Sequence, residues 1–314
     1  MILLTGATGF VGKAVVQRLL ADDDSKRVVV AVRRDGQQWP AQVLPWVMGD
    51  LEPAADWSHA LNRVSSVVHC AARVHVMHDT DADPLLAFRT VNVEGTLNLA
   101  RQAATLGVKR FLFISSVKVN GESTLPGRAF TETDAPNPHD AYGQSKHEAE
   151  QGLRQIAADT GMEVVIIRPP LVYGPGVKAN FAALMHAVRR GWPLPLGAVH
   201  NKRSMVALDN LVDFIITCIT HPQAADQTFF VSDGQDLSST DLVRGMAQAA
   251  GVTSRLLPVP VWALQTGASL LGKSDAVQRL CGNLQVDISK ARSLLGWAPP
   301  LVVSEGLRRA MYVG

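Results

Sequence analysis

The chain has 314 residues, of which 47% are hydrophobic and 18% charged, so it can bury one large core or two joined ones. Its formal net charge is +2 and its basic residues form no long runs, which argues against nucleic acid as a partner. Its three cysteines lie far apart, form no metal-binding pattern and suit a reducing compartment.

No segment is expected to span a membrane. The most apolar stretch near the end, 256–271, is too short and is interrupted by Pro258 and Pro260, although a peripheral membrane contact there stays open. A signal peptide is not expected, because the first strand begins at residue 2. We therefore expect a cytoplasmic protein.

Strand and helix patterns alternate through the first half of the chain. Apolar strands are expected at 2–5, 28–32, 66–70, 110–115 and 163–168, and helices at 84–106 and 141–160. Such alternation is typical of a parallel sheet with helices on both faces. Ligands of such sheets bind at the carboxyl ends of the strands, so we expect chemistry just after Cys70, Ser115 and Arg168.

The second half differs in composition, beginning with a proline- and glycine-rich loop at 169–176. Beyond it we expect a helix near 181–190 and a strand ending at 205–208. A further helix should be capped by Asp209 and run to Ile219. Another helix is expected within 236–251, opened by Ser238, Ser239 and Thr240, and short helices are expected over 289–313. The predicted fold is α/β: a Rossmann doubly wound parallel sheet with a smaller C-terminal α/β substrate lobe. The Rossmann part takes 1–170, rejoined by about 204–231, and the substrate lobe takes 171–203 and 232–314.

A glycine-rich turn, TGATGFVG at 5–12, follows the first strand and leads into a helical pattern. Gly6 would make the tight turn, Gly9 would allow close backbone approach, and Gly12 would allow close packing of helix on strand. A strand–turn–helix unit of this kind points backbone N–H groups and a helix N-terminus at a diphosphate. The sequence therefore predicts dinucleotide binding; the alternative is a tight turn that serves packing alone.

The end of the second strand indicates which dinucleotide is bound. It carries Arg33 and Arg34, where an NAD site usually has an acidic residue for the ribose 2′-hydroxyl. An arginine there accommodates a 2′-phosphate instead, so NADP(H) is the preferred cofactor, with NAD(H) possible. The alternative is that both arginines are solvated surface charge.

Tyr142 and Lys146 lie four residues apart at a predicted helix start and so share one helix face. An ammonium close to a phenol, together with the positive nicotinamide of an oxidised cofactor, favours the phenolate and lowers the pKa of the phenol toward the range useful for acid–base catalysis. Ser116 follows the strand that ends nearby and could bond the reacting oxygen. Each feature is common by chance, and a surface tyrosine and lysine is the alternative for the pair.

In its motifs the sequence resembles the extended short-chain dehydrogenase/reductase superfamily, in the branch of nucleotide-sugar epimerases and dehydratases. The matching motifs are TGATGFVG (5–12), GDL (49–51), HCAA (69–72), VNVEGT (91–96), ISSVKVNG (114–121), YGQSK (142–146) and RPPLVYGPG (168–176). The resemblance implies that Ser116, Tyr142 and Lys146 are catalytic. It also implies a UDP-sugar substrate, and a homodimer built on the helices at 84–106 and 141–160.

The same resemblance, together with the two arginines after the second strand, assigns the binding residues. Cofactor contacts are expected from Gly6, Thr8, Gly9, Phe10, Val11, Gly12, Arg33, Arg34, Asp50, Leu51, Cys70, Ala71, Ala72, Tyr142, Lys146 and Pro169. Substrate contacts are expected from Arg73, His75, Lys118, Asn180, Leu196, Arg203 and Arg279. Arg203 would grip the diphosphate, a task suited to guanidinium. Asn180 could instead be a helix cap, Arg279 surface charge and His75 a packed or surface residue.

Departures from the family pattern reduce the number of reactions that the chain is expected to catalyse. Dehydratases of this branch carry an Asp-Glu pair directly after the catalytic threonine, where this chain has Val117 and Lys118, so elimination of water is not expected. Arg33 and Arg34 favour an NADPH-dependent 4-ketoreductase. The motifs look most like those of enzymes of surface-polysaccharide (O-antigen) biosynthesis, and this resemblance implies that the substrate is a UDP-4-keto-6-deoxy-N-acetylhexosamine. The alternative is a 4-epimerase of UDP-hexose or UDP-N-acetylhexosamine that retains NAD. A remote alternative is a non-catalytic, dinucleotide-sensing regulator.

Overall fold

A computed structural model describes residues 1–22, 27–34, 36–74, 83–270, 272 and 274–312. Seven strands form one parallel sheet in the order β3-β2-β1-β4-β5-β6-β9. They are β1 (Ile2–Thr5), β2 (Val28–Val32), β3 (Val43–Val47), β4 (Ser66–His69), β5 (Arg110–Ile114), β6 (Glu163–Arg168) and β9 (Thr228–Phe230). The order runs outward in both directions from β1, which puts the topological switch point of a Rossmann fold at the carboxyl ends of β1 and β4. The predicted fold class is confirmed.

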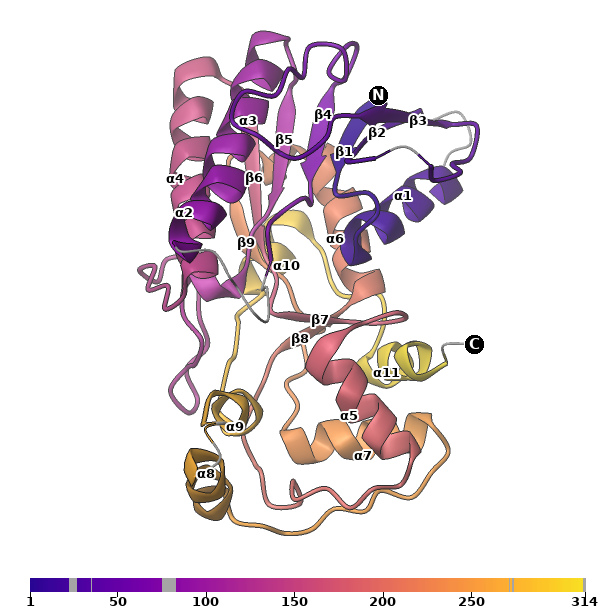
Figure 1. Ribbon diagram of the computed structural model, residues 1–314, viewed down its shortest axis with the longest axis vertical. Helices are drawn as coiled ribbons and strands as arrows, with labels where there is room; N and C mark the ends of the chain where they lie inside the picture. Colours follow the sequence, from indigo (N-terminus) through magenta and orange to yellow (C-terminus); the bar gives the residue numbers. More distant parts are fainter. Residues whose placement is uncertain (23–26, 35, 75–82, 271, 273, 313–314) are drawn as a thin grey trace.

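The two faces of the sheet each have their own core. Leu3 packs into one core and Leu4 into the other, because successive side chains of a strand point to opposite faces. The core that holds Leu3 is covered by α3 (Thr96–Thr105) and α4 (Ala141–Thr160). The core that holds Leu4 is covered by α1 (Phe10–Asp22), α6 (Leu208–Thr220) and α10 (Ser289–Leu295), as Figure 1 shows. Burial of both faces is what a parallel sheet requires.

The helix predicted over 84–106 is formed in three parts: α2 (Pro84–Arg89), a π-helical turn (Thr90–Gly95) and α3. The π turn holds Asn92, which is buried. The Asn92 side chain accepts a hydrogen bond from the Arg73 backbone N–H (2.8 Å) and donates to the Arg73 carbonyl and the Ser145 hydroxyl (3.0 Å each). Such turns occur frequently at functional sites, and this one ties the chain after β4 to the start of α4.

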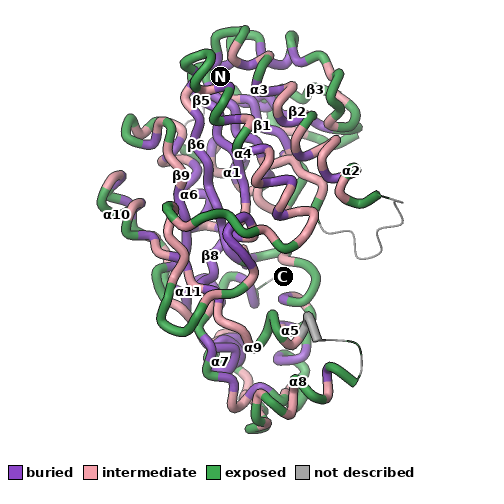
Figure 2. The backbone as a smooth tube through the Cα atoms, turned by 90° about the vertical axis from the view of Figure 1, so that its left-hand side faces the viewer, coloured by how far each residue is buried: buried purple, intermediate pink, exposed green. Residues whose placement is uncertain are grey.

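The second half of the chain adds a smaller layer beyond the carboxyl ends of the strands (Figure 1). The strands β7 (Leu171–Tyr173) and β8 (Met205–Ala207) pair in parallel. They share a third core with α5 (Ala179–Arg189), α7 (Ser239–Ala249) and α11 (Val303–Met311). The helices α8 (Val261–Leu270) and α9 (Ser274–Cys281) lie at the end of the molecule remote from the large sheet (Figures 1 and 2). None of the helices in the described ranges combines the length and hydropathy that a membrane span needs.

Most predicted elements are confirmed to within two residues, including the helix start at Ser238, whose hydroxyl accepts a bond from the Asp241 N–H (2.9 Å). The prediction that Asp209 caps α6 was wrong. The helix begins at Leu208, and the Asp209 carboxylate bonds Arg309 instead (3.2 Å). Strands β3 and β9 were not predicted: β3 contains Pro45 in its middle, and β9 has only three residues. The prediction that 169–176 is a loop was wrong in part, because β7 (Leu171–Tyr173) lies within it and pairs with β8.

Candidate active site

The glycine turn between β1 and α1 packs so closely that side chains would not fit. Gly6 has a φ of 72°, and a Cβ on it would lie 2.7 Å from the Ala71 backbone nitrogen. A Cβ on Gly12 would lie 2.2 Å from the Gly6 carbonyl oxygen. Thr8 and Gly9 are exposed just before α1 begins. Uncovered backbone at a helix N-terminus suits a diphosphate, so this turn, with Phe10 and Val11 behind it, could hold a dinucleotide.

The two arginines predicted to contact the 2′-phosphate of NADP(H) lie at the end of β2. Arg33 and Arg34 are exposed, and the Arg33 guanidinium lies 3.8 Å from the Asp50 carboxylate. Leu51 lies against the end of the π-helical turn, where a Cβ on Gly95 would lie 2.7 Å from the Leu51 carbonyl oxygen. In the group formed by Arg33, Arg34, Asp50 and Leu51, the arginines are thus open to solvent, whereas Leu51 is closely packed.

Three further predicted cofactor residues, Cys70, Ala71 and Ala72, follow β4 directly. The Ala71 N–H donates to the Thr5 hydroxyl (3.2 Å), which joins the ends of β4 and β1. Burial raises the pKa of the Cys70 thiol to about 12, so this thiol stays neutral. Pro169, after β6, is buried and its carbonyl accepts from the Val117 N–H (3.0 Å).

Ser116, Tyr142 and Lys146 come together where β5 ends and α4 begins. Lys146 is 1% exposed, and its ammonium donates to the Ile114 carbonyl (2.8 Å). The same ammonium lies 4.4 Å from the centre of the Phe113 ring and 5.9 Å from that of Tyr142. Burial lowers the pKa of Lys146 to about 8, because water no longer solvates the charge.

The two neighbouring serines have different surroundings. Ser115 is buried, and its hydroxyl donates to the Glu150 carboxylate (2.6 Å). Ser116 is half-buried and accepts only a 3.2 Å bond from the Lys118 N–H among the described residues. The Ser116 hydroxyl proton is therefore available to a ligand, whereas that of Ser115 is committed to Glu150.

Tyr142 differs from expectation in its electrostatics. Burial and the Asp140 carboxylate raise the pKa of the phenol above its ordinary value. These surroundings therefore favour the protonated phenol, which could donate a proton to a ligand. Phe88 packs edge-on against its ring at a centroid distance of 6.1 Å.

Lys118, predicted to contact substrate, lies between two carboxylates. Its ammonium donates to Glu122 (2.8 Å) and makes a very short contact with Asp140. Asp140 is also the N-cap of α4, accepting from the Gly143 N–H (2.7 Å). Lys118 thus joins the turn after Ser116 to the helix start that carries Tyr142.

A buried ion pair that the sequence analysis missed lies behind the two serines. Glu150 and Arg168 are nearly inaccessible, and the guanidinium bonds both carboxylate oxygens, one at 2.9 Å and one at 2.5 Å. Arg168 also donates to the Asn120 side chain (2.8 Å). Glu150 lies four residues after Lys146 on the same helix face, which is the signal that could have revealed it.

The arginines predicted to bind the diphosphate are neighbours. Burial first, and then the charge of Arg279, lower the pKa of Arg203, while Glu122 acts in the opposite direction. Arg203 donates to the Gly282 carbonyl (3.1 Å). Two neighbouring guanidinium groups could hold an anion between them.

The other predicted substrate residues are less closely grouped. Leu196 is buried, and its carbonyl accepts from the Thr240 hydroxyl (2.6 Å). Asn180 is exposed in the first turn of α5 and makes no cap, since that position is held by Lys178. The Arg73 guanidinium lies 5.5 Å from the centre of the Phe88 ring. His75 lies outside the described residues.

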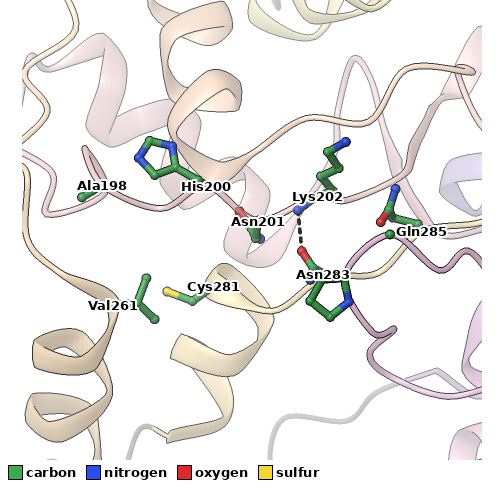
Figure 3. Close-up of a pocket in the computed structure, with 10 residues that line it drawn as sticks. Ala198, His200, Asn201, Lys202, Val261, Cys281, Asn283 and Gln285 are labelled. Carbon is green, nitrogen blue, oxygen red and sulfur yellow. Dashed lines mark hydrogen bonds between the residues drawn. The ribbon is translucent and has the colours of Figure 1, made fainter.

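A cavity of about 440 Å³ is lined by the residues directly before Arg203 (Figure 3). Asn201 and Lys202 form one side, and Cys281 and Asn283 face them, with the Lys202 N–H donating to the Asn283 side chain (2.7 Å). Arg203 follows these residues directly, so the cavity continues the region where a diphosphate would lie.

The model of the NAD dependent epimerase/dehydratase family matches residues 2–231, and the chain belongs to this family. It is 51% identical over 312 residues to a UDP-glucose 4-epimerase of Vibrio cholerae, covering 98% of this chain and 93% of that one. It is 30% identical over 329 residues to the N-acetyl-alpha-D-glucosaminyl-diphospho-ditrans,octacis-undecaprenol 4-epimerase of Escherichia coli O157:H7, covering 99% and 94%.

Among solved structures, the UDP-glucuronic acid 4-epimerase of Bacillus cereus in complex with NAD has a TM-score of 0.79 at 21% identity, covering 99% of this chain and 94% of that one. The UDP-glucose 4-epimerase of Thermotoga maritima with UDP-glucose has a TM-score of 0.76 at 22% identity, covering 99% and 97%. These two likenesses concern the fold.

Proposed function

We propose that this protein is a 4-epimerase of a UDP-linked hexose or N-acetylhexosamine that retains NAD. The observation that carries the proposal is the meeting of Ser116, Tyr142 and Lys146 at the strand ends, beside the glycine turn. The 51% identity to a protein named UDP-glucose 4-epimerase supports this reaction above the 4-ketoreductase that Arg33 and Arg34 suggested. The NAD in a structural relative supports the cofactor.

A bound nicotinamide would supply the hydride acceptor and donor that inversion at C4 needs. Tyr142 would exchange a proton with the oxygen on C4, and the Ser116 hydroxyl would hold the same oxygen. Lys146 carries its charge below about pH 8 and would stabilise the phenolate form of Tyr142 whenever the proton is on the sugar. Arg203 would hold the diphosphate while the oxidised hexose rotates within the site.

A second candidate is the NADPH-dependent 4-ketoreductase, favoured by the exposure of Arg33 and Arg34 at the end of β2. A dehydratase fits less well, because the Lys118 ammonium occupies the neighbourhood where that reaction needs free acids.

The test begins with the cofactor that the purified protein releases on denaturation. A retained NAD, with interconversion of UDP-N-acetylglucosamine and UDP-N-acetylgalactosamine and no net nicotinamide change, would support the epimerase. Consumption of NADPH one-for-one with a UDP-4-keto-6-deoxy sugar, without epimerisation, would support the reductase. The polyprenyl-diphosphate-linked sugar is assayed in parallel, because one relative is named for that substrate. Epimerisation of it alone would refute the uridine part of the proposal.

A further inference from the structure

The cavity of Figure 3 has an apolar rim that the proposed reaction does not use. Val261 lines the cavity, and the next residue, Trp262, is 70% exposed. Pro126 and Cys281 also line it, and their neighbours Leu125 and Leu280 are exposed as well. Large apolar side chains gathered at one edge are unusual on a protein surface and mark an interaction site.

The same apolar rim extends along α8 to its end. Leu270, the last residue of α8, is 85% exposed, and Leu257, shortly before the helix, is exposed too. α8 lies at the extremity of the molecule, where Figure 2 shows exposed backbone around it. A planar partner could therefore reach Trp262 and Leu270 without meeting the large sheet.

Positive charge is concentrated in the segments that form this rim. In the sequence, 123–129, 198–203 and 252–285 contain six basic residues and one acidic residue, whereas the whole chain has 30 basic and 28 acidic residues. These are Arg128, Lys202, Arg203, Arg255, Lys273 and Arg279, against Asp275. The rest of the chain therefore has a net negative charge.

We propose that the α8 rim, defined as Leu125, Leu257, Trp262, Leu270 and Leu280 with the exposed basic residues Arg128, Lys202 and Arg255, docks on an anionic phospholipid bilayer. Tryptophan prefers the level of the lipid head groups, and leucine side chains reach the acyl boundary. Basic side chains are drawn to anionic lipid, and the two contributions together give stable peripheral binding where either alone is weak. Docking in this way would present the cavity to the head groups. The proposal goes beyond the proposed function and does not depend on it.

The test is co-sedimentation of the full chain with vesicles, without substrate. Wild type should bind vesicles that contain phosphatidylglycerol, bind vesicles of phosphatidylcholine much less, and be released by salt. The double variant Trp262→Ala, Leu270→Ala should lower the partition coefficient by ~10-fold or more. A matched double variant, Trp46→Ala, Leu106→Ala, removes an exposed Trp and Leu at the sheet end of the molecule and should bind as wild type does.

Three outcomes would overturn the proposal. Wild type could fail to bind phosphatidylglycerol vesicles at low salt, or the two double variants could bind equally well. Light scattering could show that Trp262→Ala, Leu270→Ala dissociates an oligomer, in which case the rim is an interface between copies of the chain. In the variant Trp262→Ala, Leu270→Ala, epimerase activity on a water-soluble UDP-sugar should be the same as in wild type. Because vesicle binding is measured without substrate, a failed epimerase assay leaves the result intact.

Discussion

Burial of Lys146 should make the stability of the fold depend on pH. The side chain is 1% exposed, and burial lowers its pKa from 10.5 to about 8. Between these two values the unfolded chain holds the proton and the folded chain does not, so the free energy of unfolding rises with pH. At about 1.4 kcal/mol per pH unit, the gain over the window is ~3 kcal/mol. This gain in the free energy of unfolding is complete above pH 10.5. It decreases as the pH falls below 10.5 and is lost once the pH has fallen through about 8.

The substitution Lys146→Met keeps most of the apolar stem and removes the charge, so this pH dependence should disappear from the variant. Urea unfolding would be measured across the window for wild type and for the variant. The difference between their free energies of unfolding should change by ~3 kcal/mol in favour of wild type as the pH rises. Other titrating groups are common to both chains and cancel in the difference.

Lys109→Met, at an exposed lysine just before β5, provides the control and should follow wild type at every pH. Parallel curves for wild type and Lys146→Met would refute the reasoning, because they would mean that the ammonium remains solvated in the folded chain. Equal changes in both variants would show an effect of net charge rather than of burial.

Three further predictions concern the site. Tyr142→Phe should lower turnover by ~10²-fold or more with cofactor affinity nearly unchanged, and normal turnover in the epimerase assay would reject Tyr142 as the acid–base group. Arg33→Ala with Arg34→Ala should weaken NADPH binding by on the order of 2 kcal/mol more than NADH binding in fluorescence titration, and equal losses would remove the reductase candidate. Glu150→Gln leaves Arg168 buried without its carboxylate and should cost ~3 kcal/mol or more in urea unfolding, whereas a loss below ~1 kcal/mol would mean that the pair is not desolvated.

The parts of the fold that the sequence predicts well are those with strong local patterns. The helix at 141–160 has matching bounds in the structure, because Asp140 caps its start and Gly161 ends it in a left-handed conformation. Strand β3, whose sequence is VLPWV, was missed because Pro45 interrupts its apolar run, and a proline within a strand is tolerated only at an edge such as this one. The π turn at Asn92 was missed because it depends on contacts to residues distant in the chain.

Spacing alone predicts the candidate catalytic residues but not their electrostatic surroundings. The sequence predicts Ser116 to bond the reacting oxygen, and the bond between its neighbour Ser115 and Glu150, which distinguishes the two serines, is seen only in three dimensions. The sequence analysis considered the effect of Lys146 and of a bound nicotinamide on the pKa of Tyr142, but it did not show the burial of the phenol or its proximity to the Asp140 carboxylate, both of which raise that pKa.

Lys118, which stands where dehydratases of the family carry an acidic residue, connects two parts of the candidate site through its carboxylate partners. A carboxylate at the cap of α4 stabilises the helix but raises the pKa of the nearby Tyr142. The ammonium of Lys118 contacts that carboxylate. Glu122, the other partner of Lys118, also lies within electrostatic reach of Arg203. One lysine in place of an acid therefore links the proton donor to the residues proposed to hold the diphosphate.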